Sequence, residues 1–152
     1  MTSLFAQFDG PRLLRQDELI ASERLSRICF GGPEIDKEEE ILANYVPQKR
    51  GGTYILAHQG KPVSQIGIFH DRIKMYDGDI RTGGIGGVCT HPDYQGKQLA
   101  SHLLEYCTQQ LVDEGARLML ISGAHGIYTR LGNVPHGRFI SFSFNIEHSG
   151  QW

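Results

Sequence analysis

A short polar loop separates an apolar, strand-like run that ends at Thr90 from an amphipathic helix that begins near Gln98 or Leu99. The loop carries Gly96 and Lys97 just before the helix. The first turn of a helix presents unpaired backbone N–H groups and the positive end of the helix dipole, so it suits a phosphate or pyrophosphate group. Gly96 lets the backbone come close to such a group, and Lys97 adds a positive charge. The loop therefore predicts an anion site, with an ordinary capped surface helix as the alternative.

Two other phosphate-binding motifs do not fit this segment. A GxxxxGK(S/T) loop that includes Lys97 needs glycine at position 91 and Ser or Thr at position 98, where the chain has His91 and Gln98. The dinucleotide pattern GxGxxG has no match up to Gly96. The GGIGG run at residues 83–87 lies within a predicted strand, which leaves two interpretations. It is either a β-bulge or a place where a ligand comes close to the backbone.

The elements that must position this loop follow from the spacing of apolar residues. Six runs predict strands: Pro11–Arg15, Thr53–His58, Val63–Phe69, Ile80–Thr90, Leu118–Ile121 and Phe139–Ile146. Four stretches predict helices: one that Asp17 caps and Gly31 ends, residues 34–46, one with Leu99, Leu103, Cys107 and Leu111 on one face, and Gly126–Leu131. These elements place the polar loop between a strand and the clearest helix of the chain.

The order of these elements is β-α-α-β-β-β-α-β-α-β, which indicates an α+β domain with a mixed sheet. The first strands are expected to form antiparallel hairpins. The helix after Thr90 is a crossover, so Ile80–Thr90 and Leu118–Ile121 should be parallel neighbours. The continuous apolar run LMLI in the second of these strands is typical of a strand that is buried on both faces.

The segment HPDYQGKQLASHLL, residues 91–104, resembles the acetyl-CoA-binding loop of the GNAT superfamily of N-acetyltransferases, usually written (R/Q)-x-x-G-x-(G/A). Gln95 and Ala100 match its first and last positions, and Gln98 replaces its middle glycine. The preceding V-x-T-H-P-x-Y run and the helix that follows agree with this resemblance. GIYTRLGNVPHGR is similar to the family's Y-x-R-x-G-(F/Y)-x-P segment, with Asn133 where an aromatic residue is usual. The spacing of Ser122–Gly132 is similar to that of the enhanced-intracellular-survival-like acetyltransferases.

The resemblance covers residues 53–146 and implies a GNAT-like acyl-CoA N-acyltransferase fold in a single domain over residues 1–152. Its sheet would be mixed and mostly antiparallel, with two parallel strands, Ile85–Thr90 and Leu118–Ser122, that splay apart around acetyl-CoA. The pantetheine arm would pair with the backbone of the first strand, and backbone N–H groups of the loop would bind the pyrophosphate. These cofactor-binding positions are Val88, Cys89, Thr90, Gln95, Gly96, Lys97, Gln98, Leu99, Ala100 and Ser101.

The resemblance also implies the reaction, a direct transfer of the acetyl group from acetyl-CoA to a primary amine of a small molecule or peptide in a ternary complex. It assigns the acid that protonates the departing thiolate to Tyr128, with a packed core tyrosine as the alternative. No base is identified, because residues 82–88 hold no acid. Glu34, Asp36, His125 and a path through water or the substrate stay open as alternatives.

Gln98 stands where the family's loop has a glycine, and its effect depends on its backbone conformation. With a negative φ the glutamine is tolerated, because backbone donors bind the pyrophosphate. A position that needs a positive φ would cost a non-glycine residue about 1–2 kcal/mol. We expect weakened or slightly reshaped binding of CoA rather than its loss.

The bulk composition sets further limits. The chain has 152 residues, enough for one core, and its net charge of -2 argues against a nucleic acid or an anionic membrane surface as a partner. Three cysteines without CxxC spacing indicate a reducing compartment, and seven histidines without HxH or HExxH spacing predict no metal site. The sequence shows neither a signal peptide nor an apolar run of the roughly 18 residues that a membrane span needs, so a cytoplasmic protein is expected.

Two other functions stay open at this point. A catalytically weak acyl-CoA-binding regulatory module would fit Gln98 and the unidentified base, and a plain interaction domain would need no CoA site at all. The family usually ends with two antiparallel strands, whereas only EHSGQW follows Ile146. The chain is therefore expected to be either part of a longer protein or one subunit of a homodimer whose partner covers the exposed edge.

Overall fold

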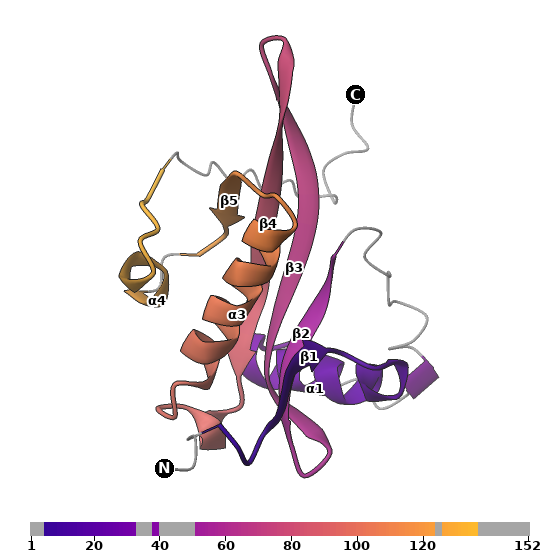
Figure 1. The fold of residues 1–152 in the computed structure, drawn as a ribbon. Coiled ribbons are helices and arrows are strands. Elements are labelled where there is room, and N and C mark those ends of the chain that lie inside the picture. Colours follow the sequence, from indigo (N-terminus) through magenta and orange to yellow (C-terminus); the bar gives the residue numbers. More distant parts are fainter. Residues whose placement is uncertain (1–4, 33–37, 40–50, 124–125, 137–152) are drawn as a thin grey trace, which may run out of the picture.

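One sheet of five strands, in the order β1-β2-β3-β4-β5, organises the part of the chain that the structure describes (Figure 1). This structure is a computed structural model, and it describes residues 5–32, 38–39, 51–123 and 126–136. The strands are β1 (Asp9–Leu13), β2 (Gly51–His58), β3 (Lys61–Met75), β4 (Gly78–Thr90) and β5 (Leu118–Ile121). The helices are α1 (Leu19–Phe30), α3 (Leu99–Asp113) and α4 (Gly126–Arg130), with single 3₁₀ turns η1 (Gln16–Glu18) and η2 (Pro92–Tyr94). Of the helix predicted over residues 34–46 only residues 38–39 are described, and the strand predicted at Phe139–Ile146 lies outside the described residues.

The pairing is antiparallel from β1 to β4 and parallel between β4 and β5. This mixed, mostly antiparallel sheet with flanking helices confirms the predicted α+β fold class. A parallel pair needs a crossover connection, and α3 supplies it. The far ends of β3 and β4 project beyond the other strands as a two-stranded arm (Figure 1).

The start of the chain differs from the prediction in its boundaries. β1 begins at Asp9, and the residue that caps α1 is Glu18 rather than Asp17, because the turn η1 precedes the helix. The guanidinium of Arg12 donates two hydrogen bonds to the Glu18 carboxylate, at 2.8 and 2.7 Å. The same carboxylate accepts the backbone N–H of Arg15 at 2.9 Å. A carboxylate held by charge-assisted bonds in this way fixes the entry into α1.

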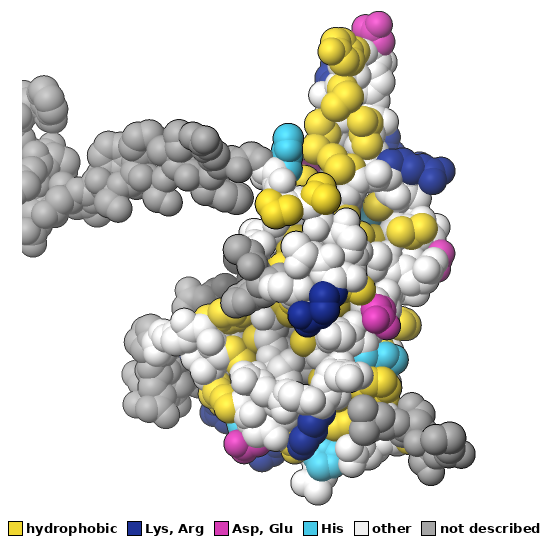
Figure 2. Space-filling view, turned by 90° about the vertical axis from the view of Figure 1, so that its left-hand side faces the viewer, with side chains coloured by type: hydrophobic (Ala, Val, Ile, Leu, Met, Phe, Trp, Pro, Cys, Tyr) yellow, Lys and Arg dark blue, Asp and Glu magenta, His cyan; other side chains and the backbone are white. Residues whose placement is uncertain are grey.

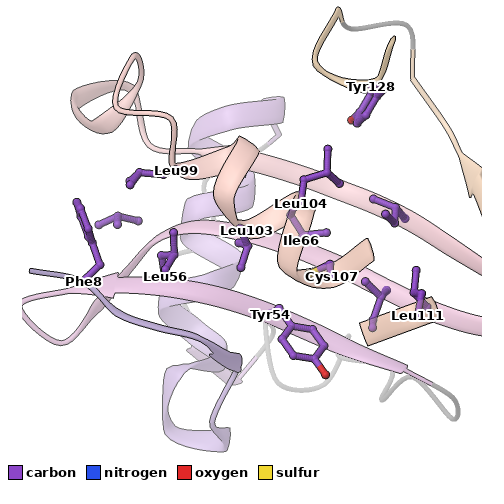
Figure 3. Close-up of a cluster of buried hydrophobic side chains, with 13 residues drawn as sticks. Phe8, Tyr54, Leu56, Ile66, Leu99, Leu103, Leu104, Cys107, Leu111 and Tyr128 are labelled. Atoms are coloured by element: carbon purple, nitrogen blue, oxygen red, sulfur yellow. The ribbon is translucent and has the colours of Figure 1, made fainter. Parts of the chain in front are cut away.

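The core lies between α3 and the face of the sheet that α3 covers (Figure 3). Leu99, Leu103, Cys107 and Leu111 recur every four residues and are at most 1% exposed, as the sequence predicts. Their partners from the strands are Tyr54, Leu56, Ile66, Ile68 and Ile85. Burial of a large aliphatic side chain contributes about 1.5–3 kcal/mol. These contacts therefore anchor α3 and give the loop at its N-terminus a defined place.

α1 lies on the opposite face of the sheet (Figure 1), where Gln65 of β3 holds it. Ser22 Oγ donates to Gln65 Oε1 at 2.8 Å, and Gln65 Nε2 donates to Ser26 Oγ at 2.7 Å. These inward-facing polar groups satisfy one another, as groups inside a protein must. Ile28 of the same helix is 54% exposed, although it is apolar, because Ser22 and Ser26 take the positions that face the sheet.

β5 is not buried on both faces, so that prediction is wrong for the described part of the molecule. Leu118 and Leu120 are 43% and 47% exposed, whereas Met119 and Ile121 pack against the core. Side chains alternate along a strand, so one pair meets the α3 side and the other pair points to the opposite face. Within the described ranges, β5 is also the edge of the sheet.

The three cysteines are free thiols, and burial raises the pKa of Cys107 to about 12. Such thiols act as small apolar side chains in a core. In the described ranges, no helix combines the length and the apolar character needed to cross a membrane. The same ranges contain no cluster of three or more His, Cys, Asp or Glu side chains that could hold a metal ion.

Candidate active site

β4 and β5 pair at one end only, and the point where they separate defines the candidate site. The parallel register runs from the pair Thr82–Leu118 to the pair Ile85–Ile121. Beyond Ile85, β4 continues along β3 to Thr90, but it has no strand on its other side among the described residues. This geometry agrees with the splayed strands that the resemblance implies.

A β-bulge lies where β4 leaves β5, and it explains the glycine-rich run. Gln65 of β3 pairs with Cys89, and Gly67 pairs with Gly86, so two residues of β4 stand opposite a single residue of β3. One of the two is Gly87, whose φ of 59° is a left-handed conformation that glycine adopts without strain. The bulge interpretation of the GGIGG run is therefore confirmed. Because a bulge bends its strand, it accounts for the separation of β4 from β5.

The loop between β4 and α3 brings the predicted pyrophosphate positions to one helix N-terminus. Gly96 has a φ of 75°, and α3 begins at Leu99, as expected. Gln98 is the N-cap residue, and its side chain makes no capping hydrogen bond in the described structure. The first-turn N–H groups of α3 and the positive end of its dipole thus face outward beside Lys97.

Gln98 has a φ of 61° and a ψ of 14°, which is the left-handed conformation that favours glycine. The negative φ that would let a glutamine replace the glycine without penalty is therefore not found. A non-glycine residue in this conformation costs about 1–2 kcal/mol. The loop keeps its shape because α3 and β4, on either side of it, are anchored in the core.

Tyr94, to which the sequence analysis assigned no role, ties the loop to the sheet. Its hydroxyl lies 2.9 Å from Nδ1 of His58 in β2. Its ring stands edge-on to His91 and lies 4.6 Å from the Nζ atom of Lys97. A cation over an aromatic face gains about 0.5–1 kcal/mol at an exposed site. The sequence signal for this role is an aromatic residue inside an otherwise polar turn.

Thr90 fastens the end of β4 to α1 and to the loop. Its carbonyl oxygen accepts hydrogen bonds from Cys29 Sγ at 3.4 Å and from Gln95 Nε2 at 3.3 Å. Its hydroxyl lies 2.8 Å from Ser64 Oγ. The Cys89 thiol lies against Cys29, and its burial together with that contact raises its pKa. The carbonyl oxygen of Cys89 is engaged as well, since it accepts a hydrogen bond from Ser64 Oγ at 3.3 Å.

Tyr128 of α4 lies on the α3 side of the sheet, in the same buried cluster as Leu104 (Figure 3). It is 7% exposed, and burial raises the pKa of its hydroxyl. Gly123, just after the end of β5, lies against the ring of Tyr128. A Cβ added to Gly123 would stand 2.9 Å from Cε2 of Tyr128 and 3.5 Å from its hydroxyl oxygen. Asn133 donates from its side chain to the Tyr128 carbonyl at 3.0 Å and closes α4. Tyr128 is thus a core residue that also borders the end of β5, where the strands part.

The strands that border the split carry no carboxylate or imidazole. Residues 82–90 and 118–123 contain no Asp, Glu or His. The three candidates for a general base, Glu34, Asp36 and His125, lie outside the described residues. The described geometry therefore assigns no base.

A sheet that opens between two parallel strands, beside an open helix N-terminus, is the architecture expected of an acyl-CoA-dependent N-acyltransferase. A family model described as an acetyltransferase (GNAT) domain matches residues 11–134. The chain therefore belongs to the GNAT family of acetyltransferases, and the predicted class of enzyme, an N-acetyltransferase, is confirmed. No curated protein sequence matches the chain.

Solved structures with this fold cover nearly the whole chain. An acetyltransferase from Trypanosoma brucei is 20% identical, with a TM-score of 0.72, and the match covers 88% of this chain and 97% of the other. A glucosamine-6-phosphate N-acetyltransferase from Arabidopsis thaliana is 15% identical, with a TM-score of 0.69 and the same coverages, 88% and 97%. An aminoglycoside acetyltransferase from an uncultured soil metagenomic sample, in complex with sisomicin, is 14% identical, with a TM-score of 0.65, covering 89% and 94%. At these identities the likeness establishes the fold.

Proposed function

We propose that this acetyltransferase transfers the acetyl group of acetyl-CoA directly to a primary amine of a small molecule or peptide within a ternary complex. The observation that carries the proposal is the split beyond Ile85 and Ile121. On the β4 side the chain leads into the uncapped N-terminus of α3, and on the β5 side Gly123 lies against the buried phenol of Tyr128. An extended ligand can pair with the free side of β4 there, as an added strand does.

Binding of acetyl-CoA is assigned to the backbone of β4 and of the loop. The pantetheine arm is assigned to the backbone of Val88, Cys89 and Thr90, on the side of β4 that faces away from β3. The pyrophosphate is assigned to N–H groups of residues 95–100, with Ser101 close by. No described atom lies within 4 Å of a Cβ added to Gly96, so the backbone at this glycine is approachable. The helix dipole and Lys97 would then balance the negative charge.

The chemistry needs a proton donor, a donor for the developing oxyanion and removal of a proton from the amine. As the amine nitrogen forms its bond to the thioester carbonyl carbon, the C–S bond breaks and the thiolate takes a proton from the Tyr128 hydroxyl. A backbone N–H on the side of residues 86–90 that faces away from β3 stabilises the oxygen that gains negative charge. Residues 82–90 and 118–123 offer no carboxylate or imidazole, so the proton that the amine loses passes to water. The Tyr128 phenolate regains a proton from this water, which restores the acid for the next turnover.

Substitution of Tyr128 by Phe tests the proposal. Thiol release from acetyl-CoA is measured with a panel of primary amines that includes amino sugars and aminoglycosides, since two of the similar structures are named for such substrates. The variant should release thiol about 100-fold more slowly and still bind CoA. Tyr106→Phe, in a partly buried tyrosine of α3 that packs against Tyr54, is the matched control and should keep its activity.

Two outcomes would contradict the proposal. Tight CoA binding without thiol release for any amine would favour the catalytically weak regulatory module. A melting temperature that CoA leaves unchanged would favour an interaction domain without a CoA site.

A further inference from the structure

A cavity of about 500 Å³ lies between α1, the β2–β3 turn and η2, and none of its lining residues belongs to β4 or β5. It is therefore separate from the split. Its apolar wall is formed by side chains of α1 and of the start of β3, among them Ala21, Leu25, Ile28 and Val63. Small-molecule sites have volumes of about 300–1,000 Å³ and mostly apolar walls with a few polar groups, and this cavity fits that description.

The polar side chains that line this cavity can all donate hydrogen bonds, and two of them, Arg24 and Lys61, carry a permanent positive charge. These polar residues are Arg24, His58, Gln59, Lys61, His91 and Tyr94. Among the described lining residues there is no carboxylate, although the whole chain has a net charge of -2. Two carboxylates lie just outside this lining, Glu38 beside Arg24 and Asp93 beside His91. The cations that line the cavity itself, together with its apolar wall, favour a ligand that is anionic at one end and apolar at the other.

Arg24 has a partner that a ligand can replace. Its Nη2 atom lies 3.3 Å from Oε1 of Glu38, and the two side chains are 57% and 59% exposed. An ion pair exposed to this extent contributes about 0–1 kcal/mol. An anion seated in the cavity would therefore meet little competition for the guanidinium.

We propose that this cavity binds a small molecule that joins an apolar or aromatic body to one anionic group, and that Tyr94 relays its occupancy to the loop in front of α3. The anionic group lies between Arg24 and Lys61, and the apolar body rests on the wall of α1 and β3. Neither the reaction nor the binding of acetyl-CoA requires this site.

The relay follows from the two environments of Tyr94. Its side chain lines the cavity, its hydroxyl is 2.9 Å from His58 Nδ1, and its ring holds the Lys97 ammonium at 4.6 Å. A ligand that contacts Tyr94 or His58 changes how the ring supports Lys97 and hence the charge offered to a pyrophosphate. Coupling of this kind must be reciprocal, so CoA would change the affinity of the cavity by the same factor. This second part rests on the proposed CoA site, whereas binding in the cavity does not.

Phenyl phosphate is a suitable probe, because it joins an aromatic ring to an anion, and phenol is its uncharged control. Binding to the full chain is measured by calorimetry with CoA at saturation, so that the N-terminus of α3 is already occupied. Phenyl phosphate should bind saturably and phenol should not. The double variant Arg24→Met, Lys61→Met should weaken binding at least tenfold, whereas Lys74→Met, an exposed cation on the β3–β4 arm, should leave it unchanged. An unfolding curve of each variant checks that it is folded.

Three results would overturn binding in the cavity: no saturable binding, binding that the double variant retains, or binding that Lys97→Met abolishes and CoA displaces. If CoA itself failed to bind, the same titrations without CoA would still show whether phenyl phosphate binds in the cavity. Failure of the proposed CoA site and failure of the cavity proposal can therefore be told apart. For the relay, saturating phenyl phosphate should change the Kd for CoA several-fold in the unmodified chain and not in Tyr94→Leu. An unchanged Kd in the unmodified chain would overturn the relay.

Discussion

The backbone carbonyl of Gln98 accepts the N–H of His102 at 3.0 Å, so α3 takes its first hydrogen bond from a residue in the left-handed conformation. The chain uses this conformation to turn from the loop into the helix. The resemblance places a glycine at this position, and the geometry gives the physical reason for one, because glycine has no Cβ to clash in that conformation.

Replacement of Gln98 by Gly should keep or tighten CoA binding and stabilise the fold. Relief of about 1–2 kcal/mol of backbone strain is partly offset by about 0.5–1 kcal/mol of extra chain entropy in the unfolded state. A gain of up to about 1.5 kcal/mol in the free energy of unfolding is expected in urea titrations. Gln98→Ala, which removes the side chain but not the strain, should show no gain. Loss of CoA binding in Gln98→Gly would contradict the proposed role of the loop.

Gly123→Ala should slow turnover by displacing the phenol of Tyr128. A Cβ at position 123 would stand 2.9 Å from the Tyr128 ring, and the φ of 153° is also unfavourable for alanine. We expect kcat to fall at least tenfold with little change in CoA affinity. Gly132→Ala is the matched control, because its φ is 83° and no described atom lies within 4 Å of the added Cβ. Equal losses of kcat in both variants would argue against a catalytic Tyr128.

The value of kcat should not fall as pH rises toward the ordinary pKa of tyrosine, because Tyr128 keeps its proton over this range. Burial raises the pKa of Tyr128, so its hydroxyl stays protonated to a higher pH than the usual value of about 10. The test is kcat measured from about pH 7 to pH 10, a range that ends at the ordinary tyrosine pKa. A decline centred well below pH 10 that disappears in Tyr128→Phe would refute this assignment of the protonation state.

Glu18→Gln should destabilise the protein at neutral pH by about 1.5–3 kcal/mol, the range for hydrogen bonds to charged groups. The hydrogen bonds from Arg12 hold the pKa of Glu18 below its ordinary value, and the backbone N–H of Arg15 adds to this effect. A lowered pKa contributes stability that is present above the unfolded pKa and is lost as pH falls through the folded value. The difference between the two proteins should therefore shrink below about pH 4. Glu105→Gln, at an exposed position on α3, should have little effect at either pH.

The apolar surface of the molecule shows where prediction from sequence reached its limit. Hydrophobic side chains line the β3–β4 arm (Figure 2), and Ile73 and Met75 are 37% and 50% exposed there. An alternating or continuous apolar run reveals a strand, but it does not reveal what lies over each face. The burial of Leu118 and Leu120 was therefore predicted wrongly, while the strand itself was found.

Local spacing in the sequence determined the elements and the position of the candidate site. The four-residue repeat from Leu99 to Leu111 defined α3, because an apolar stripe at helical spacing has only one way to be buried. The glycine-bearing loop ahead of Leu99 was also predictable, because the residues around the start of a helix have a local sequence pattern. The parallel pairing of β4 and β5 followed from the length of the crossover between them.

The tertiary structure alone decided the conformations and partners inside that site. It set the left-handed φ of Gln98, the contact of Tyr94 with His58 and the approach of Tyr128 to the end of β5. Each depends on contacts between segments far apart in the chain, and the energy that holds a strained or buried group comes from the packed surroundings rather than from its neighbours in sequence. The sequence therefore predicted which segments form the candidate site, and the packing of α3, α4 and the sheet determined the conformations and contacts of its residues.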